Sequence, residues 1–265
     1  MAWNSGRREL SRKAQTLIGV GLAVVTVVAV GGGLAYDRQR GHVDVSGLAP
    51  VEQPELVAET AKPVKVNVPT NRPLSAMIVG DSITVGVGAT VPENGWAPTL
   101  IRQLERTTPV EASISAVSGA NTAEQMARTD FSRPQDLVVL ELGTNDNGNT
   151  ADEPPTDVAL LRQQYTDLVT RVRATSPDAA LICLGGWLAA TPAVPIDAVI
   201  KQACYDNGGK FVELTGLYQN NALRGPEGRV AWDGPGDNFH PNDDGMRRIQ
   251  QLVTARYELA PSGDQ

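Results

Sequence analysis

Two side chains far apart in this sequence could together activate a hydroxyl group. Ser82 stands in the turn Gly80-Asp81-Ser82-Ile83-Thr84, directly after the apolar run 74–79, which predicts a buried strand. A hydroxyl becomes a good nucleophile only beside a base, and His240 brings an imidazole in Asp237-Asn238-Phe239-His240-Pro241. Asp237 can bond Nδ1–H of that ring and turn Nε2 toward the serine. We therefore predict that Ser82 is a nucleophile, that His240 is its base, and that Asp237 is the acid that orients the base.

Two further positions could bind the negative charge that develops when a hydroxyl attacks a carbonyl. Gly119 follows a second strand-like run, 110–117, and Asn145 follows a third, 136–142. A backbone N–H in a glycine turn and an asparagine amide are suitable donors for such an oxyanion. Because the carboxyl ends of parallel strands meet at one edge of a sheet, we expect both donors to lie near Ser82.

Nearby acidic residues leave some of these roles open. Asp233, Asp243 and Asp244 are alternatives to Asp237 as the partner of the histidine, and the spacing of three residues favours Asp237. We expect Asp81 to shape the serine turn and Asp146 to brace the loop that carries Asn145. No Gly-x-Ser-x-Gly pattern surrounds the serine, which argues against the nucleophile elbow of the α/β-hydrolases.

Four short blocks, taken in their order along the chain, resemble the SGNH (GDSL-type) hydrolase family. They are Gly80-Asp81-Ser82, Gly119, Gly143-Thr144-Asn145-Asp146 and Asp237-x-x-His240. The resemblance covers residues 73–260. It implies that Ser82 is the nucleophile, that His240 is the base oriented by Asp237, and that Gly119, Asn145 and the Ser82 N–H form the oxyanion hole.

Strand and helix patterns alternate through the same region. Strands are predicted over 74–79, 110–117, 136–142, 179–184 and 210–214, and helices over 96–106, 122–128, 157–175, 196–207 and 243–259. Such alternation predicts a single three-layer α/β/α domain with a five-stranded parallel sheet. The family resemblance implies the flavodoxin-like strand order 2-1-3-4-5, which the sequence alone does not establish.

The N-terminal region has a different composition from the domain. Residues 1–13 are polar and basic, and residues 14–36 carry no charge. An uncharged segment of that length can cross a hydrocarbon core of about 30 Å as a helix. We therefore predict a single-pass membrane anchor with the domain outside the cytoplasm; the alternative is a signal peptide that is cleaved to release a secreted domain. Residues 37–72, rich in proline, read as a linker, and 261–265 as a tail.

Charge and cysteine content exclude some classes of partner. The chain has a formal net charge of −7, and because residues 1–40 contribute +4, the remainder carries −11. This balance argues against a nucleic-acid partner.

The two cysteines have no metal-ligand spacing, and the domain holds one histidine, so we expect no metal or organic cofactor.

The two cysteines are candidates for a disulfide. Cys183 ends the fourth predicted strand, and Cys204 lies in the helix that should pack beside it. An exported domain meets an oxidising environment, which favours a disulfide. The alternative is a pair of buried free thiols.

Together these features predict an extracytoplasmic serine esterase or lipase-type hydrolase that acts on an acyl or acetyl ester. Its location outside the cytoplasm would make cell-envelope lipids or acylated glycans accessible substrates. Two alternatives stay open: an acyltransferase that uses the same site, and a catalytically silent envelope-binding module on the same fold.

Overall fold

A central sheet of five parallel strands organises the protein. The structure is a computed structural model, and it describes residues 62–147 and 157–261. The sheet has the order β3-β2-β4-β5-β6, which is 2-1-3-4-5 along the chain, as the family resemblance implied. Its strands are β2 (Leu74–Gly80), β3 (Val110–Ala116), β4 (Leu137–Glu141), β5 (Ala180–Leu184) and β6 (Lys210–Val212). The predicted α/β domain with a five-stranded parallel sheet is confirmed.

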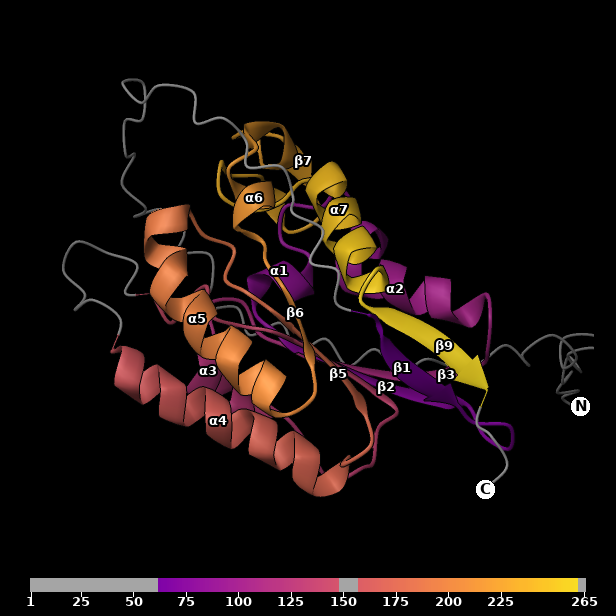
Figure 1. The fold of residues 1–265 in the computed structure, drawn as a ribbon. Coiled ribbons are helices and arrows are strands. Elements are labelled where there is room, and N and C mark those ends of the chain that lie inside the picture. Colours follow the sequence, from indigo (N-terminus) through magenta and orange to yellow (C-terminus); the bar gives the residue numbers. More distant parts are fainter. Residues whose placement is uncertain (1–61, 148–156, 262–265) are drawn as a thin grey trace, which may run out of the picture.

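Helices cover both faces of this sheet. Figure 1 shows α2 (Trp96–Glu105) and α7 (Asp243–Thr254) on one face, and α3 (Thr122–Arg128), α4 (Val158–Thr175) and α5 (Ala190–Asp206) on the other. Successive side chains of a strand point to opposite faces, so β2 sends Ala76 and Ile78 into the core beneath α2 and α7, and Met77 and Val79 into the core beneath α4 and α5. The buried strands thus separate two apolar layers.

Short elements connect the larger ones near the ends of the strands. A single helical turn, α1 (Ser82–Val85), follows β2, and η3 (Pro92–Asn94) precedes α2. The connection between β6 and α7 contains α6 (Thr215–Tyr218), η4 (Asn221–Leu223) and the hairpin of β7 (Val230–Ala231) with β8 (Gly234–Pro235). This long connection brings His240 to the start of α7.

A two-stranded parallel sheet joins the first and last described segments, and it corrects two predictions. Residues assigned to the linker, 37–72, include β1 (Val64–Val68), which pairs with β9 (Tyr257–Pro261). The helix predicted over 243–259 ends at Thr254. Val66 is fully buried in this pairing, and Figure 1 shows the two strands side by side. Each strand is short and depends on a partner at the other end of the chain, so neither had a clear local signal.

Helix α5 begins earlier than predicted. The prediction started it at residue 196, but the helix runs from Ala190 and contains Pro195. Proline lacks a backbone N–H, so Pro195, the sixth residue of the helix, leaves the carbonyl of Thr191 without its usual intrahelical hydrogen bond. The helix continues through this proline, which therefore does not mark its boundary.

The predicted membrane segment, residues 14–36, lies outside the described residues, as does most of the predicted linker. Over 62–147 and 157–261, none of the helices has both the length and the apolar character needed to cross a membrane.

Candidate active site

Strand register brings three of the predicted site residues to one edge of the sheet. Gly80, the last residue of β2, lies opposite Ala116 of β3 on one side and Glu141 of β4 on the other. Ser82, Gly119 and Asn145 follow these three positions within a few residues of the strand ends. The parallel pairing therefore places all three in neighbouring turns, as the sequence predicted.

The turn that carries Ser82 is built by the two residues before it. Asp81 is the N-cap of α1, and its Oδ1 accepts the backbone N–H of Ile83 at 2.9 Å, which is the usual way to satisfy an N–H at a helix start. A side chain at Gly80 would place its Cβ 2.0 Å from Thr84 Oγ1 and 2.9 Å from the carbonyl oxygen of Glu141. Glycine is therefore required here, and Asp81 shapes the turn as expected.

A line of hydrogen bonds joins the predicted nucleophile, base and orienting acid. His240 Nε2 lies 3.0 Å from Ser82 Oγ, although the two residues are 158 positions apart. The other ring nitrogen, Nδ1, lies 2.7 Å from Asp237 Oδ2. His240 is 2% exposed and Ser82 5%. A histidine held between a carboxylate and a hydroxyl has the arrangement needed to accept the hydroxyl proton.

Asp237 holds the histidine through both of its oxygens. Its Oδ1 accepts the backbone N–H groups of Phe239 at 2.8 Å and of His240 at 2.7 Å, while Oδ2 faces the ring. Burial alone would raise the pKa of Asp237, but the side-chain hydrogen bond and charge of His240, together with the two backbone N–H groups, outweigh burial and lower it. Asp237 therefore stays a carboxylate, the form that can orient the ring.

The three alternative aspartates make other contacts. Asp243 accepts the N–H and the hydroxyl of Thr90, and Asp244 pairs with Arg247. Asp233 accepts a long hydrogen bond from a backbone N–H in the loop after α1. Among these four acidic residues, the structure brings Asp237 to the imidazole.

Gly119 and Asn145 lie beside the serine turn. Gly119 has φ +80°, a backbone conformation that favours glycine, and no atom lies within 4 Å of the position that a Cβ would take. Asn145 Nδ2 donates to Asp81 Oδ2 at 3.2 Å and to the carbonyl oxygen of Ala120 at 3.0 Å. Asp81 directly precedes Ser82, and Ala120 directly follows Gly119. The Asn145 amide therefore lies between the serine turn and the glycine turn.

Comparison with known proteins identifies a family for this chain. The sequence profile of the family described as "GDSL-like Lipase/Acylhydrolase family" matches residues 78–248, which is more than half of the chain. The chain belongs to this family. The prediction of an ester-hydrolysing enzyme is thereby confirmed at the level of the family. A search of curated protein sequences found no match.

Several solved structures, two carbohydrate-directed esterases among them, have a similar fold. A family two carbohydrate esterase from Clostridium thermocellum, in complex with cellohexaose, is 22% identical with a TM-score of 0.53 over 69% of this chain, and this chain covers 64% of its length. TesA is 22% identical with a TM-score of 0.52, over 68% of this chain and 96% of its own. The acetyl xylan esterase AlAXEase is 19% identical with a TM-score of 0.53, over 69% and 98% respectively.

In this GDSL-family enzyme, the loop that carries His240 is braced by aromatic residues that the sequence analysis did not identify. Trp187, fully buried, donates its Nε1–H to the carbonyl oxygen of Phe239 at 2.7 Å. Edge-to-face contacts then run from Trp187 through Tyr218 and Phe239 to the ring of His240, with centroids 5.1–5.7 Å apart. An aromatic residue directly before a candidate histidine was the available signal.

Asp146 has the bracing role that was predicted for it. Its carboxylate accepts the N–H of Thr122 at 3.1 Å and the Thr122 hydroxyl at 2.9 Å. Thr122 begins α3, so the contact ties the Asn145 loop to the turn that contains Gly119.

A buried glutamate near the serine was also missed. Glu141 ends β4, is fully buried, and accepts the hydroxyl of Thr84 at 2.8 Å and, more weakly, the N–H of Asp81 at 3.4 Å. The available signal was a single acidic residue within the apolar run Leu137–Leu142, because such a residue in a buried strand needs polar partners.

The two cysteines are joined. Cys183 of β5 and Cys204 of α5, both fully buried, form a disulfide. The bond ties a helix to the central sheet, and it is the pairing that the sequence predicted.

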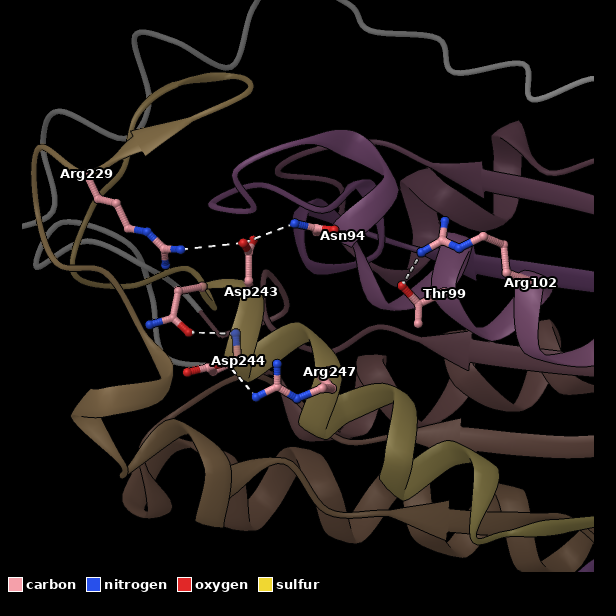
Figure 2. Close-up of a pocket in the computed structure, with 8 residues that line it drawn as sticks. Asn94, Thr99, Arg102, Arg229, Asp243, Asp244 and Arg247 are labelled. Atoms are coloured by element: carbon pink, nitrogen blue, oxygen red, sulfur yellow. Dashed lines mark hydrogen bonds and ion pairs between the residues drawn. The ribbon is translucent and has the colours of Figure 1, made fainter.

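A charged cavity lies apart from these residues. Figure 2 shows ion pairs between Arg229 and Asp243, 3.5 Å apart, and between Arg247 and Asp244, 2.6 Å apart. Its lining consists of Asn94, Thr99, Arg102, Arg229, Asn242, Asp243, Asp244 and Arg247. The amide of Asn94, the last residue of η3, also donates to Asp243 at 3.1 Å. Asp243 therefore attaches the start of α7, the helix that follows His240, both to η3 and to the residue before β7.

Proposed function

We propose that this GDSL-family enzyme is an extracytoplasmic serine esterase that uses Ser82, His240 and Asp237. The observation that carries the proposal is the continuous line of hydrogen bonds from Asp237 Oδ2 through the imidazole to Ser82 Oγ. A binding module would need neither a base aligned on a hydroxyl nor an acid aligned on the base. This alignment therefore favours catalysis over the silent envelope-binding alternative.

The geometry supports acyl transfer through a covalent intermediate. Ser82 Oγ attacks the ester carbonyl as its proton moves to His240 Nε2, and Asp237 stabilises the imidazolium that forms. The tetrahedral oxyanion is bound by the N–H groups of Ser82 and Gly119 and by the amide of Asn145. His240 then gives its proton to the leaving alcohol, and a water molecule, activated by the same base, releases the acyl group as a carboxylic acid.

Asn145 has to change one hydrogen bond during this cycle. Its Nδ2 has two N–H bonds, and both are directed at protein acceptors, Asp81 and the carbonyl of Ala120. To bind the oxyanion, the amide must exchange or share one of them. The contact with Asp81, at 3.2 Å, is the longer of the two and is the one we expect to yield.

For the substrate, we propose an acyl or acetyl ester on a cell-envelope glycan or lipid. The similar folds include a carbohydrate esterase solved with cellohexaose and an acetyl xylan esterase, which supports the glycan as the first class to test. Export is supported by the uncharged segment 14–36 after a basic start and by the disulfide, a bond typical of oxidising compartments. Protease added to intact cells should digest an exported domain, whereas digestion only after lysis would contradict export.

The decisive experiment compares the wild type with Ser82→Ala on p-nitrophenyl acetate and on acetylated oligosaccharides. We expect a fluorophosphonate to label the wild type, and Ser82→Ala to lose both labelling and hydrolysis. Ser132→Ala, which removes an exposed hydroxyl, is the matched control and should behave as the wild type. Full activity in Ser82→Ala would refute the nucleophile assignment, and acyl products on an added alcohol instead of free acid would indicate an acyltransferase.

A further inference from the structure

Two buried carboxyl groups lie directly behind the catalytic serine, and the mechanism above uses neither. Asp81 and Glu141 are both fully buried. Within the part of the chain that the structure describes, no lysine or arginine forms an ion pair with either one. Two unpaired carboxylates in contact cannot both stay ionised, because the repulsion between them adds to the loss of hydration.

The two groups differ in the donors that surround them. Asp81 accepts the N–H of Ile83 at 2.9 Å on Oδ1 and the amide of Asn145 at 3.2 Å on Oδ2. Glu141 receives the hydroxyl of Thr84 and a long backbone N–H on Oε2, and its Oε1 is buried without any such donor. The backbone N–H of Asp81 lies 3.4 Å from Glu141 Oε2, which brings the two carboxyl groups close together. A proton on one of them would remove the repulsion between them.

The donor pattern assigns that proton to Glu141. Hydrogen bonds from N–H groups to both oxygens favour the charged form of Asp81. Burial, followed by the charge of Asp81, raises the pKa of Glu141 well above its ordinary value. Burial also raises the pKa of Asp81, to about 6, so at neutral pH Asp81 is the ionised member.

Asp81 also determines which way the Asn145 amide faces. The two groups beside Nδ2, Asp81 Oδ2 and the Ala120 carbonyl, are both acceptors, and Asn145 Oδ1 is buried without a partner. A flipped amide would direct its oxygen at both acceptors and would be repelled. The orientation that presents N–H groups near Ser82 therefore depends on Asp81 staying an acceptor.

We propose that Glu141 is a positioning residue that keeps its proton and donates it to Asp81, so that Asp81 stays the carboxylate that fixes both the serine turn and the Asn145 amide. The proposal rests on the proposed function, because its effect on rate passes through Ser82 and Asn145. Without the Glu141 donor, buried Asp81 would itself take up a proton. It would then lose its preference for the N–H side of Asn145, and the oxyanion donor would no longer be held.

Other titratable groups near the pair come from three further segments. His240 lies close enough to favour the charged form of Asp81, and Asp146 lies close enough to disfavour it. Tyr165 of α4 is fully buried, and burial raises its pKa well above the ordinary value. Tyr165 therefore stays neutral at working pH. Ionisation of Glu141 would add a charge that no nearby cation balances, and it should produce a loss of rate at alkaline pH.

Two variants of Glu141 separate a positioning role from a merely structural one. Glu141→Gln keeps an N–H donor for Asp81 and an oxygen for Thr84, whereas Glu141→Leu keeps the volume and removes both. On p-nitrophenyl acetate we expect Glu141→Gln to retain kcat within about 3-fold and to lose the alkaline decline. We expect Glu141→Leu to lower kcat about 10- to 100-fold with KM nearly unchanged, since the oxyanion contact forms in the transition state.

Circular dichroism and the number of fluorophosphonate-reactive sites report the folded fraction, so a loss of kcat can be corrected for misfolding. Wild-type kcat in correctly folded Glu141→Leu would overturn the proposal. Glu141→Gln as slow as Glu141→Leu would also overturn it, because an ionised Glu141 would then be required. An infrared carbonyl band of a protonated carboxyl at neutral pH, absent from Glu141→Gln, tests the proton independently of activity. An enzyme that hydrolyses no ester but shows this band would refute the proposed function and leave the proton assignment in place.

Discussion

Replacing Glu141 with glutamine should change how the stability of the fold depends on pH. Glu141 is fully buried and its pKa is raised well above the ordinary value of 4.5 by burial and then by the charge of Asp81. In the unfolded chain the same carboxyl is hydrated and ionises near the ordinary value. Between that value and the raised pKa, the folded protein holds one proton that the unfolded chain has released.

The sign and the size follow from proton linkage. A proton bound by the folded state alone stabilises the fold at low pH, and this stabilisation is lost as the pH rises toward the raised pKa of Glu141. Each pH unit changes the free energy of unfolding by about 1.36 kcal/mol for one proton. While the pH stays between the ordinary value and the raised pKa, the wild type should therefore lose on the order of 1 kcal/mol per pH unit that Glu141→Gln does not lose. Asp81 is present in both proteins, so its own contribution largely cancels from the difference.

Urea unfolding at pH 5, 6 and 7, with the disulfide intact, measures this difference directly. Glu105→Gln, which removes an exposed carboxyl of α2, is the matched control, and its stability should run parallel to that of the wild type. Parallel curves for the wild type and Glu141→Gln would show that Glu141 is ionised in the folded protein. That result would refute the proton assignment and the positioning role together.

Three further outcomes are expected. Asn145→Ala should lower kcat about 10²- to 10³-fold on p-nitrophenyl acetate, and Asn147→Ala, in the same loop, should not; equal rates would remove Asn145 from the oxyanion hole. Asp237→Asn should lower kcat by up to about 10⁴-fold with a smaller change in KM. Full activity in Asp237→Asn, or a loss of activity in Asp233→Asn instead, would show that Asp237 is not the orienting acid. Cys204→Ser should lower the free energy of unfolding by about 3 kcal/mol, and two titratable thiols in unreduced, denatured wild type would show that the disulfide does not form in solution.

The central sheet and the site residues could be predicted because their signals are local. Leu74–Gly80 is an apolar run that ends in a glycine turn, and β4 and β5 have similar runs, whereas β3 alternates polar and apolar residues. The strand order was available through the family resemblance and not through the residues. Asp237 and His240 were recognisable because a spacing of three residues brings an acid to a ring within one loop, and the structure places them 2.7 Å apart.

The missed features depend on contacts between distant segments. Val64–Val68 is a strand because Tyr257–Pro261 pairs with it, and neither segment indicates its partner. The brace behind His240 combines Trp187 and Tyr218, which come from separate connections and meet only in the folded chain. A pattern within a short window cannot report contacts of this kind.

The strand register explains why an acidic residue, Glu141, is tolerated in a buried strand. A lone acid in an apolar strand costs free energy unless polar partners meet it. Parallel pairing sets Glu141 opposite Gly80, and the missing side chain at Gly80 leaves room for Thr84 to approach. The next residue, Asp81, then contacts the glutamate and also caps the turn of Ser82. Gly80 therefore has two effects. Its lack of a side chain allows the close backbone packing that shapes the Ser82 turn, and it leaves the space in which buried Glu141 contacts that turn.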